Sequence, residues 1–115
     1  MSETQSLYHE VTKDIAHKRR TVAPKQAEAF KAFTQAVFAE GVLSAKTKQL
    51  IAVAVAHVTQ CPYCIQGHTR SAQKAGASEE ELMEAIWVAA EMRAGAAYAH
   101  SAIALETMSS TNQPQ

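Results

Sequence analysis

Apolar residues recur at every third or fourth position along most of this chain, which is the periodicity of amphipathic helices. Alanine is abundant, stretches that alternate β-branched with polar residues are rare, and no Asn-Gly or Asp-Gly hairpin signal occurs. The pattern therefore predicts an all-α fold, a single-domain bundle of about five to six helices. We expect these helices from about Ser6 to near Arg20, from Pro24 to Gly41, from Ser44 onward, from Pro62 to Gly76, and from Ser78 onward.

Two of these helices have well-defined start signals. Pro62 suits the first position of a helix, where its missing N–H has no partner to lose, and this places Cys61 at or near the N-cap. Ser78 and Glu81 have the spacing of a capping box, in which each side chain accepts a hydrogen bond from the other residue's backbone N–H. The fourth helix should therefore begin beside Cys61, and the last one beside Ser78.

The expected core comes from the same periodicity. The run from Leu50 to Ala56 is the longest apolar segment, and an almost wholly apolar helix belongs at the centre of a bundle. Aromatic side chains at helical spacing are also expected in the core: Phe30, Phe33, Phe38 and Trp87. Small-residue runs at 89–90 and 94–97 permit close backbone approach, so they predict either a helix crossing within the chain or a subunit interface.

No internal repeat or linker divides the sequence, and 115 residues suit one domain. We expect an N-terminal helix and its connection over 1–23, the core over 24–108, and a disordered polar tail over 109–115. Because an alanine-rich domain of this size often gains stability by association, we expect a homo-oligomer.

Composition restricts the possible roles. Eleven basic and 11 acidic residues leave a formal net charge of zero, which argues against nucleic-acid and membrane-surface partners, because both usually require a basic face. The apolar run 50–56 is far below the roughly 20 residues that span a bilayer, and residues 1–5 lack the features of a signal peptide. We therefore expect a cytoplasmic protein.

The only two cysteines, Cys61 and Cys64, are separated by two residues in a Cys-Pro-Tyr-Cys motif. In a cytoplasmic protein such a pair is typical of redox chemistry or metal binding rather than of a structural staple. A helix N-terminus favours the thiolate, and cysteines in CxxC motifs can have their pKa lowered from about 8.5 to roughly 3.5–7.5. His68 follows Cys64 by four residues on the same helix face, where its ring can accept the thiol proton.

Two other interpretations of these residues stay open. Together with His57, which precedes Cys61 by four residues, the cysteines and His68 form a Cys₂His₂ set suited to zinc. However, all four lie within twelve residues, whereas zinc modules take their second half-site from a distant segment. The cysteines could also be small core residues without chemistry. We favour the redox site, with no metal or cofactor, and we expect Pro62 to separate His57 from the other three.

Four segments carry a family resemblance, namely Lys48–Ala56, Gln60–Ile65, His68–Arg70 and Ala75–Ser78. Across about Pro24 to Leu105 the chain resembles the carboxymuconolactone decarboxylase family, and more specifically its alkylhydroperoxidase D-like core. The resemblance implies an all-α protein that forms trimers or hexamers and acts as a thiol-dependent peroxidase or disulfide reductase. Decarboxylases of the family typically lack the cysteine pair, so its presence favours the peroxidase branch.

The resemblance also implies roles for individual residues. Cys64 corresponds to the reactive thiol, Cys61 to the resolving thiol and His68 to the histidine of a proton relay. That relay usually begins with a glutamate twelve residues before the first cysteine, where this chain has Gln49. Glutamine can orient His68 but cannot take a proton. Either the relay is weakened, which would give low peroxidase activity, or another base comes from elsewhere in the chain, and the candidates are His57, Glu40 and Glu91.

The leading hypothesis is therefore a peroxidase for antioxidant defence that reduces hydroperoxides through Cys61 and Cys64. A dithiol or a lipoyl-type donor, or a peroxiredoxin, would exchange electrons with the resulting disulfide. A second hypothesis is a disulfide-exchange adaptor for a peroxiredoxin or a lipoyl protein. A third is a decarboxylase of a small lactone acid, or a non-catalytic oligomeric binding module.

Overall fold

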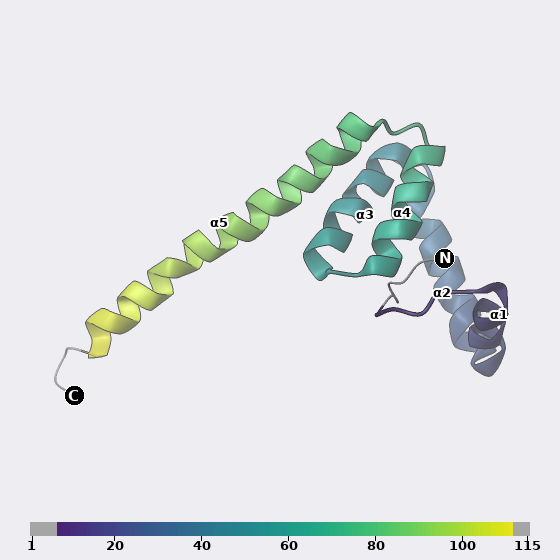
Figure 1. Cartoon of the computed structure of the whole chain (residues 1–115), viewed down its shortest axis with the longest axis horizontal. Coiled ribbons are helices and arrows are strands. Elements are labelled where there is room, and N and C mark those ends of the chain that lie inside the picture. Colours follow the sequence, from purple (N-terminus) through teal and green to yellow (C-terminus); the bar gives the residue numbers. More distant parts are fainter. Residues whose placement is uncertain (1–6, 112–115) are drawn as a thin grey trace. The chain divides into compact units, whose positions relative to one another are not determined.

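The computed structural model describes residues 7–111, and within that range the chain forms five α-helices and no strand. The predicted all-α fold is confirmed. Figure 1 shows the helices in chain order. They are α1 (Lys13–Val22), α2 (Pro24–Phe38), α3 (Ala45–Thr59), α4 (Pro62–Lys74) and α5 (Glu79–Thr111).

The described residues fall into two compact units, one ending at Ala45 and one beginning at Lys46. In the first unit α1 packs against α2. The first helix begins later than predicted, because the Thr12 side chain caps it by accepting a hydrogen bond from the Ile15 N–H at 3.2 Å. The predicted start at Ser6 lies outside the described residues.

The second helix starts at Pro24 as predicted but ends at Phe38, before Gly41. The segment 39–44 that follows is not helical. Glu40, near its start, links it to α3, because Glu40 Oε1 accepts a hydrogen bond from the Ala45 N–H at 3.0 Å. This bond satisfies one of the N–H groups that the start of α3 leaves without an intrahelical acceptor.

In the second unit α3 and α4 lie side by side, and a short loop leads from α4 into α5 (Figure 1). Gly76 in this loop has φ +97°, a conformation that glycine adopts without steric cost. The predicted capping box is confirmed, with Ser78 N–H donating to Glu81 Oε1 at 2.9 Å and Glu81 N–H donating to Ser78 Oγ at 3.1 Å. The last helix continues through residues 109–111, where a tail was expected.

The core of the described chain is small. Its buried apolar side chains, one valine and three alanines, come from the three helices of the second unit: Val53, Ala56, Ala72 and Ala89. The run 50–56 contributes two of them, but Ile51 and Val55 on its other face are about half exposed. No helix among residues 7–111 combines the length and apolar character needed to cross a bilayer.

The prediction of an aromatic core is wrong for this chain taken alone. Phe30, Phe33 and Trp87 are each more than 60% exposed, and Phe38 is half-buried. Helical periodicity identifies the face on which a side chain lies, but it does not identify what covers that face. The exposed aromatic side chains therefore leave a large apolar area in contact with water.

Two polar contacts tie α5 to α3. At the start of α5, Glu81 Oε2 accepts a hydrogen bond from Lys46 Nζ at 2.7 Å, and this contact is an ion pair. Further along, Arg93 Nη1 donates to the Val58 carbonyl at 3.0 Å. The Lys46 ammonium, with the Ser78 N–H, holds the pKa of the Glu81 carboxyl below its usual value.

Replacing Glu81 with glutamine tests this ion pair without removing the cap, because a glutamine at this position of a capping box still accepts the Ser78 N–H. A carboxyl whose pKa is lowered by folding stabilises the protein above its unfolded-state pKa of about 4.3, and this contribution disappears as the pH falls through the folded-state value. We expect Glu81→Gln to lower the melting temperature at pH 7, and the difference from wild type to vanish near pH 3. Glu80→Gln, at an exposed position, is the control. An equal loss at both pH values would contradict the electrostatic origin.

Candidate redox site

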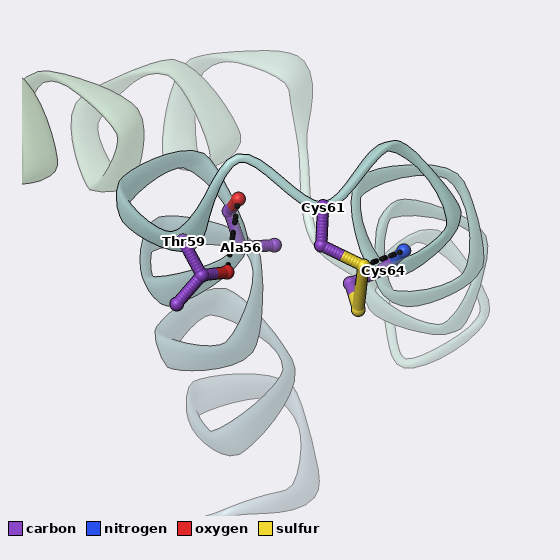
Figure 2. The surroundings of a disulfide bond; sticks show 4 residues. All are labelled: Ala56, Thr59, Cys61 and Cys64. Atoms are coloured by element: carbon purple, nitrogen blue, oxygen red, sulfur yellow. Dashed lines mark hydrogen bonds between the residues drawn. A yellow bond between two sulfur atoms is a disulfide. The ribbon is translucent and has the colours of Figure 1, made fainter. Parts of the chain in front are cut away.

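The site is built around a sharp turn between α3 and α4. After α3 ends at Thr59, Gln60 adopts a left-handed conformation with φ +58°, and the Cys61 N–H donates to the Ala56 carbonyl at 3.1 Å. This is a Schellman motif, in which the residue after the left-handed position bonds back to a carbonyl of the last helical turn. Thr59 Oγ1 donates to the same carbonyl at 3.4 Å (Figure 2).

Cys61 is the N-cap of α4 and Pro62 its first residue, as predicted. The Cys64 N–H donates to Cys61 Sγ at 3.2 Å, so the sulfur occupies the place of an ordinary capping oxygen. The first-turn N–H groups and the helix dipole stabilise negative charge at this position. The turn therefore delivers Cys61 to a place where a thiolate is favoured.

Cys61 and Cys64 are joined by a disulfide bond (Figure 2). Their Cα atoms are 5.2 Å apart, within the range usual for disulfides, so the helical turn brings the two sulfurs together without distorting the backbone. Both cysteines are half-buried. The pair is thus in its oxidised state, and two electrons would convert it into two thiols.

His68 lies one turn after Cys64 on α4, and its ring is held from the neighbouring helix. Its Nδ1 is 2.8 Å from Oε1 of Gln49 on α3. An amide oxygen only accepts hydrogen bonds, so Nδ1 carries the proton of this bond. In the neutral ring the basic lone pair is then on Nε2. Gln49 therefore selects the tautomer and the orientation of His68, as a carboxylate at the same position would, but without adding negative charge.

The other candidate bases are placed differently. Nδ1 of His57 lies 2.7 Å from the Val53 carbonyl one turn earlier in α3, so this ring donates to its own helix. Glu40 caps the start of α3. Glu91 is exposed on α5, and its Oε1 lies 3.3 Å from the point that a Cβ on Gly95 would occupy. His57 and Glu40 thus each have a local structural contact, whereas the Nδ1 contact of His68 is made by Gln49.

Sequence reasoning missed two residues that shape the site. Gln60 adopts the left-handed conformation of the turn before Cys61. The sequence could have indicated this turn, because the apolar helix must end before the Cys61-Pro62 pair that starts the next helix. Arg93 donates to the Val58 carbonyl, close to the C-terminal end of α3. A cation at this end of a helix is favourable. Nothing in the sequence pairs positions 58 and 93, because only folding brings them together.

Comparison with known proteins agrees with this architecture. A family model, the carboxymuconolactone decarboxylase family, matches residues 24–107. Uncharacterized protein 4 in the cox locus of Paracoccus denitrificans is 64% identical over 81 residues, which are 70% of this chain and 73% of that protein.

Solved structures show the same helical arrangement. A crystal structure from Methanobacterium thermoautotrophicum has a TM-score of 0.69 and 43% identity, covering 76% of this chain and 97% of the other. A carboxymuconolactone decarboxylase family protein from Legionella pneumophila has a TM-score of 0.68 and 37% identity, covering 90% of this chain and 95% of the other. With five helices among its described residues and the match over residues 24–107, this chain belongs to the carboxymuconolactone decarboxylase family.

Proposed function

We propose that this chain is a thiol-dependent peroxidase that reduces hydroperoxides through Cys61 and Cys64. The observation that carries the proposal is a disulfide at the N-terminus of α4, one turn before His68. The tautomer of His68 is fixed by its partly buried hydrogen bond to Gln49. The site thus combines a reversible two-electron couple with a group that can move a proton. Hydroperoxide reduction needs both.

In the reduced form, Nε2 of His68 takes the proton of the Cys64 thiol, which lies on the same face of α4 one turn earlier. The thiolate attacks the distal oxygen of the hydroperoxide. The O–O bond breaks, an S–O bond forms, and the alkoxide or hydroxide that leaves takes the proton from His68. The products are a Cys64 sulfenic acid and an alcohol or water.

The Cys61 thiol then attacks the sulfenic sulfur, so that the S–S bond forms and water leaves. The helix N-terminus favours this step because it stabilises the Cys61 thiolate, whose sulfur accepts the Cys64 N–H in the disulfide form. A dithiol donor resets the pair by exchange: it forms its own disulfide and returns two thiols to the protein. We further propose a dithiol or lipoyl-type donor and a role in antioxidant defence.

A second candidate function is a disulfide-exchange adaptor that passes electrons to a peroxiredoxin or a lipoyl protein. The observation that favours it is the neutral Gln49 amide at the position of the relay carboxylate. Thiol–disulfide exchange depends on a thiolate and its access, and it needs less proton transfer than cleavage of a peroxide. Turnover with hydroperoxide alone, compared with turnover after addition of a peroxiredoxin, separates the two functions.

Serine variants of the two cysteines test the chemical roles. We expect Cys64→Ser to reduce hydroperoxide consumption to the rate of protein-free buffer, because the attacking atom is lost. Cys61→Ser keeps a favoured N-cap residue and should therefore fold normally. It should consume one equivalent of peroxide per chain and then stop, with the sulfenic acid at Cys64 trapped by a dione reagent and counted by mass spectrometry. Full turnover by Cys64→Ser would disprove the proposal.

The variant Gln49→Glu tests how much the absence of a carboxylate at this position lowers the rate constant for peroxide reduction. A carboxylate at Nδ1 stabilises the protonated His68 ring that forms when the thiol is deprotonated, so we expect the peroxide rate constant at pH 7 to rise on the order of tenfold, the effect of about 1.4 kcal/mol. The matched control is Gln66→Glu, which adds the same charge at an exposed position of α4. An equal increase in both variants would mean that the effect is one of net charge. No increase in either would show that Gln49 already performs the positioning role in full.

A further inference from the structure

A hollow of about 720 Å³ lies within the first unit, where the last turn of α1 meets the first half of α2. Ala23 is the single residue between the two helices, so Arg19 and Arg20 at the end of α1 come close to the start of α2. Sites that hold small molecules usually have volumes of roughly 300–1,000 Å³. The hollow is therefore large enough for a small organic molecule.

The side that α2 contributes to the hollow is one face of the helix. Its positions 23, 26, 27, 30 and 31 follow one another at helical spacing, so their side chains point to the same side. Ala23 and Ala27 are too small to fill the space beside α1, and the ring of Phe30 is 67% exposed. This face is thus mainly apolar, and the amide of Gln26 is its uncharged polar group.

Three cations line the hollow, and they come from both helices. Arg19 and Arg20 belong to α1, and Lys31 belongs to α2. Among residues 7–111 no carboxylate lines the hollow, and none of these three side chains forms an ion pair. Like charges that are brought together repel one another, and an anion bound between them relieves this repulsion. The hollow is therefore complementary to a negative charge, although the whole chain has a formal net charge of zero.

The helix dipole accounts for only part of this cluster. A cation in the last turn of a helix is stabilised by the negative end of the dipole, and Arg19 and Arg20 occupy such positions in α1. Lys31 lies midway along α2, where the dipole of its own helix gives no such stabilisation. An anionic ligand shared by the two helices accounts for all three positions.

We propose that this hollow binds a small amphipathic anion, namely a carboxylate or phosphate head group attached to an apolar chain or ring. Each guanidinium group can bind such a head group through two parallel N–H donors, and the Lys31 ammonium adds a third positive charge. The apolar part of the ligand lies against Ala27 and the Phe30 ring, where it leaves water. The site belongs to the first unit, whereas the Cys61–Cys64 pair belongs to the second.

The experiment is isothermal titration calorimetry of the full chain with matched probes: octanoate, octyl phosphate, 1-octanol and inorganic phosphate. The octyl compounds are kept below the concentrations at which they form micelles. We expect at least one of the two octyl anions to bind with a stoichiometry of one per chain, and the tighter of the two identifies the head group. The alcohol lacks the charge and inorganic phosphate lacks the apolar chain, so each should bind roughly tenfold more weakly or less tightly still. Added NaCl should weaken the binding of the octyl anions.

Exposed variants on both helices locate the site. Lys31→Gln should weaken binding of the octyl anion on the order of tenfold, because one charge-assisted hydrogen bond is lost. Arg20→Gln should have a similar effect from the other helix, and it provides the same comparison if Lys31→Gln does not fold. The matched control is Lys18→Gln, which removes the same charge from an exposed position of α1 that does not line the hollow and should keep the wild-type affinity. Circular dichroism establishes that the helices are retained.

Several results would overturn the proposal. Failure of both octyl anions to bind would exclude the site, and an equal loss of affinity in Lys31→Gln and Lys18→Gln would mean that only net charge matters. Binding of 1-octanol as tight as that of the anions would mean that the hollow does not recognise charge. Binding confined to vesicles of anionic phospholipid would assign the cations to a membrane surface instead. None of these readouts involves the thiols, so the outcome is independent of the proposed peroxidase activity.

Discussion

The left-handed turn at Gln60 is the constraint on which the site depends. It ends α3, reverses the chain within two residues, and starts α4 with Cys61 as the N-cap. A left-handed conformation costs a non-glycine residue about 1–2 kcal/mol. The cost is offset by the bond from the Cys61 N–H to the Ala56 carbonyl and by the packing of the two helices that the turn makes possible. Were α3 and α4 one continuous helix, Gln49 and His68 could not meet.

The contact between Gln49 and His68 defines the chemical character of the site. An amide and a carboxylate hold an imidazole in the same tautomer, since both accept the Nδ1 proton. They differ when the ring becomes charged, because only the carboxylate stabilises the imidazolium electrostatically. The proposed relay therefore has a histidine of fixed tautomer but no carboxylate behind it. In the proposed mechanism, the helix N-terminus at Cys61 supplies the remaining stabilisation of a thiolate.

The fully buried core of the described residues is small. Among the described residues it consists of one valine and three alanines, and each buried methyl or methylene group contributes only about 0.8 kcal/mol. In the chain taken alone, Phe30, Phe33 and the second half of α5 leave apolar side chains exposed.

Local features were predictable from the sequence because their causes are local. Pro62 and Ser78 determine where two helices begin, and the four-residue spacing of Cys64 and His68 determines that they share a helix face. Only the tertiary structure decided that His68 contacts Gln49, that His57 donates to its own helix, and that Trp87 is exposed. Helical periodicity gives the angle of a side chain around its own axis, whereas the partner on that face is set by how separate helices pack.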